Sequence, residues 1–210
     1  MLFADPDPAL LTGIVVALLA GITFHEFSHA LLADQLGDHR PRALGRVSLN
    51  PLRHLDPLGA VFFLIAGFGW GKPVPVNAYA LRPGRIGMTM VAAAGPLANL
   101  ALAALVALLF RTLSLAGLLD ADFPRLLVAS IVFFNIVLGL FNLIPIPPLD
   151  GYNVVLPLLP PRQAFIVQRY APYGYVALLL LVVLSYVSIS GPLDWLFQLA
   201  GALSGYMLGA

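Results

Sequence analysis

Hydrophobic residues fall in long blocks in this sequence, and not in the short periodic stripes that are typical of a soluble helical domain. About 20 apolar residues of helix span a bilayer core, and four of the five blocks reach that length. The fifth, with 16 residues, needs the preceding turn as well. The pattern predicts an all-α polytopic membrane protein with about five transmembrane helices. The five blocks cover residues 8–33, 86–110, 126–149, 171–193 and 195–210.

Composition supports a chain that is surrounded mainly by lipid. Hydrophobic residues make up 60% of the 210 residues and charged residues only 10%, whereas a soluble domain carries about 25% charged residues. The absence of cysteine excludes disulfides and thiol catalysis, and the net charge of +1 gives no indication of nucleic-acid binding. Because no Lys or Arg precedes the first block, we expect a retained helix there and not a signal peptide. We expect one membrane-embedded domain over residues 1–210, with a core at 8–155 and C-terminal helices at 171–210.

A shorter apolar stretch, Leu58–Trp70, lies between the first and second blocks. As a helix its 13 residues would reach only about 20 Å, and its glycines favour a re-entrant or strand-like segment. If the stretch does not cross, nine Lys and Arg residues lie on one side of the membrane and two on the other; if it crosses, the division is six against five. The positive-inside rule favours the first arrangement and places residues 38–85 in the cytoplasm of a cell-membrane protein. The nine are Arg40, Arg42, Arg46, Arg53, Lys72, Arg82, Arg85, Arg162 and Arg169.

The first block contains the sequence His25-Glu26-Phe27-Ser28-His29. On a helix, His25 and His29 share one face and lie one turn apart, so two neutral imidazoles can bind one Zn²⁺. Glu26 can then accept a proton from water activated by the metal. The alternative is a chance match or a helix with one wet polar face. These three residues are the only ionisable ones in the block, and burying such groups in lipid costs a few kcal/mol each, which favours the metal site.

Asp150 is the candidate third ligand, because it is the only acidic residue between Asp122 and Asp194. Its alternative interpretation is an Asp-Gly turn after a helix that prolines have ended. If Leu58–Trp70 does not cross the membrane, Asp150 falls on the same side as His25; if it crosses, the two cannot share a metal. The charge count and the metal site therefore favour the same topology.

Together with the histidine motif, the later stretch Asn142-Leu-Ile-Pro-Ile-Pro-Pro-Leu-Asp150-Gly resembles the site-2 protease family of intramembrane metalloproteases. The resemblance covers roughly residues 20–155. It includes Gly95–Asn99, which is similar to the family's Gly-x-x-x-Asn stretch. It also includes Asn50–His54 and Gly71–Asn77, which are similar to its short bacterial and archaeal members.

The resemblance implies an enzyme that hydrolyses peptide bonds within or next to transmembrane segments of membrane proteins, with one Zn²⁺ per chain. It implies His25, His29 and Asp150 as metal ligands and Glu26 as the general base. It also implies that Asn142 steadies the substrate strand or the developing oxyanion. The expected partners are a transmembrane protein substrate and the lipid bilayer, with the active site toward the cytoplasmic side.

Three further residues are candidate substrate contacts: His54, Val76 and Asn99. His54 could gate the site or bind substrate, although a solvated loop histidine is the commoner case. We expect the Val74–Tyr79 edge to pair with an unwound substrate strand by β-augmentation. Asn99, like Asn135, could equally well form hydrogen bonds between helices.

Two other functions use the same metal ligands without hydrolysis. A transporter or metal-handling protein would bind Zn²⁺ only, but no internal repeat is present in the sequence and simple binding does not need Glu26. A catalytically silent, chaperone-like relative would be expected to lack Glu26 or a histidine, and this chain keeps all three.

Overall fold

The computed structural model describes residues 8–59, 71–117, 122–187 and 191–209. The structure is 78% helical, and no strand occurs in these ranges, so the prediction of an all-α protein is confirmed. Short 3-10 turns occur at Pro51–Arg53, Ala78–Ala80, Leu156–Leu158 and Ala171–Tyr173. The α-helices are α1 (Pro8–Gln35), α2 (Arg40–Ala43), α4 (Arg85–Leu115), α5 (Asp122–Asn142), α6 (Asp150–Val155), α7 (Pro161–Tyr170), α8 (Gly174–Val187) and α9 (Asp194–Leu208).

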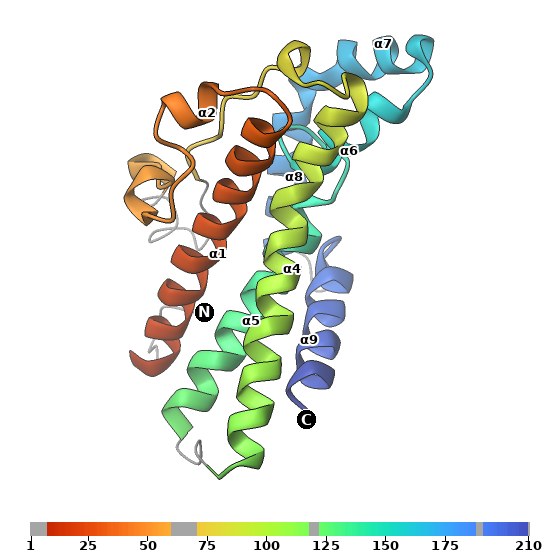
Figure 1. Cartoon of the computed structure of the whole chain (residues 1–210). Helices are drawn as coiled ribbons and strands as arrows, with labels where there is room; N and C mark the ends of the chain where they lie inside the picture. Colours follow the sequence, from red (N-terminus) through yellow and green to blue (C-terminus); the bar gives the residue numbers. More distant parts are fainter. Residues whose placement is uncertain (1–7, 60–70, 118–121, 188–190, 210) are drawn as a thin grey trace.

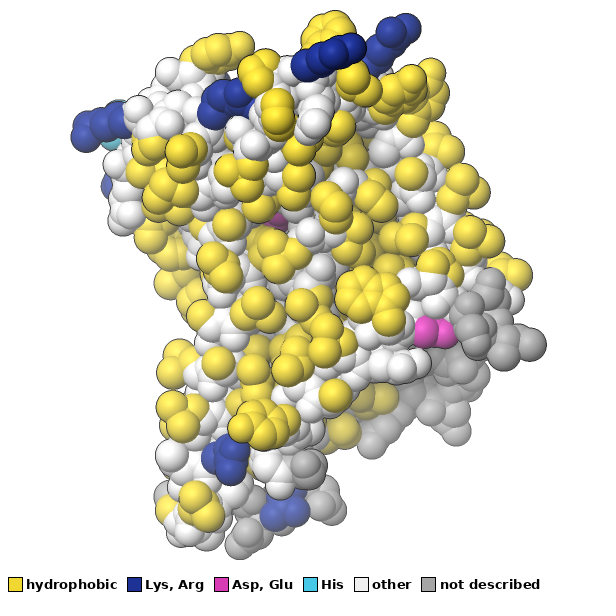
Figure 2. Space-filling model, turned by 90° about the vertical axis from the view of Figure 1, so that its right-hand side faces the viewer, with side chains coloured by type: hydrophobic (Ala, Val, Ile, Leu, Met, Phe, Trp, Pro, Cys, Tyr) yellow, Lys and Arg dark blue, Asp and Glu magenta, His cyan; other side chains and the backbone are white. Residues whose placement is uncertain are grey.

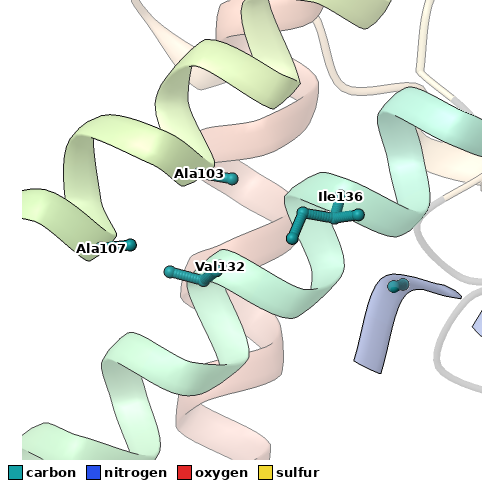
Figure 3. Packing of buried hydrophobic residues seen from close by; sticks show 5 residues of the cluster. Ala103, Ala107, Val132 and Ile136 are labelled. Atoms are coloured by element: carbon teal, nitrogen blue, oxygen red, sulfur yellow. The ribbon is translucent and has the colours of Figure 1, made fainter. Parts of the chain in front are cut away.

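The helices α1, α4 and α5 pack against one another, and α9 packs against α4 and α5 (Figure 1). Small residues allow this close approach. Ala103 and Ala107 of α4 face Val132 and Ile136 of α5, and all four side chains are buried (Figure 3). Ala200 of α9 completes this core. Alanine at the contact surface brings helix backbones near each other in lipid, where packing rather than the hydrophobic effect drives helix association.

Four stretches are long and apolar enough to cross a membrane: Leu10–Gln35, Arg85–Leu115, Phe123–Asn142 and Pro161–Ser185. Figure 2 shows a broad hydrophobic surface between Lys and Arg side chains at the two ends of the molecule. The predicted fifth block forms α9, whose 15 residues extend only about 22 Å. Among the described residues the expected number of about five transmembrane helices is therefore matched only approximately, by four candidate stretches and the shorter α9.

Successive long helices run in alternating directions (Figure 1). The end of α1, the start of α4 and the end of α5 consequently lie toward the same end of the bundle, where α2 also lies. This is the arrangement that the charge count favoured. It brings His25 and His29 on α1 to a similar depth as residues 143–150, which follow α5.

The predicted re-entrant stretch Leu58–Trp70 lies mostly outside the described residues, but its two flanks are described. Leu55 and Gly71 form an isolated antiparallel bridge, and the Lys72 amide donates to the His54 carbonyl at 2.7 Å. The two flanks of the stretch therefore lie next to each other.

Candidate metal centre

Three ligand atoms meet where α1 approaches the start of α6. His25 and His29 are buried on one face of α1, and their Nε2 atoms lie 3.0 Å apart. Asp150, the first residue of α6, places Oδ2 2.9 Å from His25 Nε2 and 3.2 Å from His29 Nε2. The structure thus brings together the three residues that the sequence nominated as ligands.

This triangle fits a small divalent metal ion. For bonds of 2.0–2.1 Å in a tetrahedral site, neighbouring ligand atoms are about 3.3 Å apart. The three observed separations, 2.9 to 3.2 Å, are close to that value. Two imidazoles and one carboxylate suit zinc, and three protein ligands leave a fourth position open for water or substrate.

The other nitrogen of each imidazole is held by an acceptor. His25 Nδ1 lies 2.7 Å from Asn99 Oδ1, and His29 Nδ1 lies 2.7 Å from the Val91 carbonyl oxygen. Both acceptors lack a hydrogen, so each Nδ1 carries the proton and donates it. The lone pairs are therefore on the two Nε2 atoms that face Asp150, which is the tautomer that metal binding requires.

A buried chain of amides continues behind His25. Asn99 Nδ2 donates to the Gly21 carbonyl at 3.0 Å and to Asn135 Oδ1 at 2.9 Å, which links α1, α4 and α5. Asn99 is fully buried, and both hydrogens of its amide are used. Hydrogen bonding between helices, the alternative interpretation of Asn99, is therefore observed, and a contact of Asn99 with substrate stays a prediction.

Gly95 of α4 lies against the histidine pair. A β-carbon at this position would be 2.4 Å from His29 Nε2 and 2.7 Å from His25 Nε2. No side chain can therefore be placed there without occupying the space in front of the two nitrogens. The sequence analysis noted Gly95 only as the first residue of the Gly95–Asn99 stretch. No residue near Gly95 in the sequence indicates its contact with the two histidines.

Asp150 is positioned by a tight connection between α5 and α6. The Ile146 amide donates to the Ile144 carbonyl at 2.8 Å, and the Leu149 amide donates to Ile146 at 2.9 Å. Gly151 then packs on the Leu143 carbonyl so closely that a β-carbon would lie 2.2 Å from its oxygen. The Asp-Gly pair begins α6, so the alternative interpretation of an Asp-Gly turn is wrong; the turn residues precede the pair, and the start of α6 carries the carboxylate to the histidines.

Asn142 ends α5, on the chain just before this connection. Its side-chain amide donates to the Leu138 carbonyl of the same helix at 2.9 Å. This bond uses one of the two amide hydrogens. The role of Asn142 toward substrate stays a prediction.

Glu26 lies beside an arginine that the sequence analysis used only as a positive charge. Arg46 Nη2 is 3.9 Å from Glu26 Oε2, and the two side chains are 6% and 13% exposed. Gly71 borders the same carboxylate, since a β-carbon there would be 3.4 Å from Glu26 Oε1. Burial lowers the pKa of the Arg46 guanidinium, and the Glu26 carboxylate partly offsets this. Arginine remains protonated at neutral pH, so Arg46 places a positive charge beside the carboxyl group of Glu26.

His54 is completely buried, which makes the expectation of a solvated loop histidine wrong. Its Nε2 bonds the Ser48 carbonyl oxygen at 2.6 Å, and its backbone carbonyl receives the Lys72 amide. The histidine therefore ties the two flanks of the 58–70 stretch together. A direct contact between His54 and substrate stays untested.

Val76 belongs to a segment without regular secondary structure, residues 72–77, that ends at the extended residue Asn77, where the 3-10 turn at Ala78 begins. The expected edge was Val74–Tyr79, so its last two residues are not extended. The Asn77 amide donates to Asp38 Oδ2 at 2.6 Å, which fixes the segment to the end of α1. Val76 itself packs on Ala33, Leu81 and Val91.

Fold and site together define a polytopic membrane protein in which His25, His29 and Asp150 form a group that could hold a metal ion. Comparison with curated proteins gives the family. The chain is 38% identical over 185 residues to "Putative zinc metalloprotease YwhC" of Bacillus subtilis (strain 168), covering 83% of this chain and 82% of that protein. It is 33% identical over 212 residues to "Putative zinc metalloprotease Rip2" of Mycobacterium tuberculosis (strain ATCC 25618 / H37Rv), covering 93% and 78%.

A third relative, Rip2 of Mycolicibacterium smegmatis, is 30% identical over 215 residues. The chain belongs to the zinc metalloprotease family that YwhC and Rip2 represent. No protein-family profile matches the chain. No solved structure matches it either.

Proposed function

We propose that this protein is an intramembrane zinc endopeptidase of the site-2 type, which cuts peptide bonds within or next to transmembrane segments. The observation that carries the proposal is the triangle of His25, His29 and Asp150 ligand atoms, enclosed by helices long enough to span a bilayer. Intramembrane ionisable groups are costly and are rarely kept without a function. The names of the relatives support the zinc protease part of the proposal.

Zinc bound by His25, His29 and Asp150 supplies a Lewis acid that polarises a carbonyl and makes water more acidic. Glu26 follows His25 on the same helix and has no role as a ligand in the triangle. Its carboxylate accepts the proton of the attacking water and then delivers it to the nitrogen of the departing amine. In the proposed complex the second amide hydrogen of Asn142 donates to the oxygen of the substrate carbonyl.

A helical peptide bond is shielded by its own hydrogen bonds, so the substrate must unwind before it reacts. Residues 72–77, which belong to no helix, offer a surface for the unwound strand. In strand geometry Pro73 and Pro75, which have no N–H, would fall on one edge, and Val74 and Val76 would present their N–H and C=O groups on the other. Within the described chain neither valine backbone takes part in a hydrogen bond. The unpaired edge suits β-augmentation by the substrate.

The site lies toward the end of the bundle that carries α2 and most arginines. The positive-inside rule makes this end cytoplasmic. We therefore expect cleavage near the cytoplasmic boundary of a substrate helix in the cell membrane.

Purified protein and a single-span substrate test the proposal. Wild type should cleave, and Glu26→Gln should lose about 10²- to 10⁴-fold of the rate, the usual contribution of an acid–base group. Both proteins should retain one zinc per chain. Zinc binding without cleavage by wild type would refute the protease and favour a transporter or a silent relative.

A further inference from the structure

Arg46 occupies an unusual place for an arginine in this protein. It follows α2 in the sequence, yet its side chain is only 6% exposed and reaches the carboxylate of Glu26 on α1, at 3.9 Å. Its Nη2 also donates to the backbone carbonyl of Lys72. Three separate parts of the chain therefore meet at one guanidinium.

Neighbouring arginines are placed differently. Arg40 pairs with Asp38 and Arg42 pairs with Asp34, and both arginine side chains are more than half exposed, at 52% and 63%. These pairs lie at the wet end of α1. Arg46, by contrast, is buried beside the residue that we propose as the general base.

A purely structural tether does not account for the buried charge. Moving a guanidinium out of water costs several kcal/mol, and a neutral donor could hold the Lys72 carbonyl without that cost. Arg46 Nε has no hydrogen-bond partner in the described structure, so the guanidinium is not fully used as a tether. The positive charge of Arg46 lies near the Glu26 carboxylate, whose side chain is 13% exposed.

We propose that Arg46 is a positioning residue, which holds the Glu26 carboxylate in its working orientation and links it to the backbone of Lys72. Arg46 Nη2 and Glu26 Oε2 are too far apart for a hydrogen bond, so the guanidinium, anchored on the Lys72 carbonyl, acts on the carboxylate through its charge. Glu26 alone on a helix would choose among several rotamers. Arg46 removes that freedom without touching the metal ligands.

The inference rests on the proposed function, so its test has one readout that depends on cleavage and one that does not. The variants are Arg46→Gln, Arg46→Lys and the control Arg53→Gln, which removes the same charge from an exposed arginine of the same loop. We expect Arg46→Gln to lower kcat about 10- to 100-fold, part of the 10²- to 10⁴-fold that an acid–base group contributes. KM and zinc content should stay within about twofold, Arg46→Lys should recover part of kcat, and Arg53→Gln should match wild type.

Equal kcat for Arg46→Gln and Arg53→Gln would overturn the inference. A loss that appears only in KM, or that follows loss of zinc, would overturn it as well.

The second readout is the melting midpoint of zinc-free protein in detergent, measured for Glu26→Gln, Arg46→Gln and the double variant. If the two side chains support each other, each single variant leaves an uncompensated buried charge, and the double variant melts at a higher temperature than the sum of the single shifts predicts. Strictly additive shifts would overturn the pairing. If wild type fails to cleave any substrate, the proposed function fails, while this cycle still decides whether Arg46 holds Glu26.

Discussion

Gly95 of α4 faces His29 of α1 at a distance that leaves no room for a side chain: a β-carbon on Gly95 would lie 2.4 Å from His29 Nε2. The same carbon would be 2.7 Å from His25 Nε2. The glycine therefore keeps open the space on which the two imidazoles converge.

Gly95→Ala should consequently abolish zinc binding while leaving the protein folded. Alanine is a better helix former than glycine by about 1 kcal/mol, so the substitution does not weaken α4 itself. The added methyl group has no flexible neighbour to displace, because both contacting rings are held through their Nδ1 atoms. The measurement is zinc per chain after purification, with the melting midpoint recorded on the same samples.

Gly201→Ala is the matched control. A β-carbon on Gly201 of α9 meets nothing within 4 Å. This variant should bind zinc as wild type does, and a Gly95→Ala protein with full zinc content would contradict the proposed geometry.

Asn99→Ala should weaken zinc binding about 10- to 100-fold, the usual effect of losing a partner of a metal-bound histidine. The substitution leaves His25 Nδ1 without its acceptor and also leaves the Gly21 carbonyl and Asn135 without a donor. Competition with a chelator of known affinity gives the zinc dissociation constant. Asn135→Ala keeps the His25–Asn99 bond, so its dissociation constant should change less; an equal change would assign Asn99 a general packing role.

The metal ligands could be predicted from the sequence because two of them are local. The four-residue spacing of His25 and His29 fixes their common face on any helix. The prediction of Asp150 as a ligand also required the number of membrane crossings between it and His25. The observed distance of 2.9 Å between His25 Nε2 and Asp150 Oδ2 agrees with that prediction. Long apolar blocks likewise predicted the long helices.

Other features depend on tertiary contacts that leave no local pattern. Gly95 and Arg46 act through residues distant in sequence, so the sequence showed only a glycine in a helix and a charge in a loop. His54 was mistaken for a wet residue because its burial comes from the pairing of Leu55 with Gly71.

The same limit applied to α7 and α9. Arginines and glutamines interrupt the apolar pattern in α7, so no helix was expected there. The last predicted block, 195–210, needed the preceding turn to reach bilayer length, but α9 begins at Asp194, and the Gly191 amide donates to Asp194 Oδ2 at 2.8 Å in a turn that is not part of the helix.

Asp38 should make folding sensitive to acid. Its side chain is 1% exposed, and the hydrogen bonds from the Arg40 guanidinium hold the pKa of the carboxyl at about 2, below the ordinary 3.8. A lowered folded-state pKa stabilises the protein above the unfolded-state value, and this contribution is lost as pH falls through the folded-state value. We expect Asp38→Asn to cost about 1–3 kcal/mol of unfolding free energy above pH 5.

The difference between wild type and Asp38→Asn should then shrink as pH falls from about 4 to about 2, because protonation makes the two side chains alike. Denaturant unfolding in detergent at a series of pH values measures it. If the difference in unfolding free energy between the two proteins stayed constant down to pH 2, the stabilising effect of Asp38 would not depend on its charge.

Val76→Pro should impair cleavage of helical substrates more than it impairs zinc binding. Proline removes the Val76 N–H, which in the proposed complex donates to the substrate strand, while Val76 has no backbone hydrogen bond of its own to lose in the described structure. Val76→Ala is the control, since it keeps the N–H but removes the side-chain contacts with Ala33, Leu81 and Val91. Cleavage rates on one single-span substrate, with zinc content for each variant, separate the two effects. Equal losses of cleavage in both variants would assign Val76 a packing role, and a parallel loss of zinc would place the damage at the metal centre instead of at the strand edge.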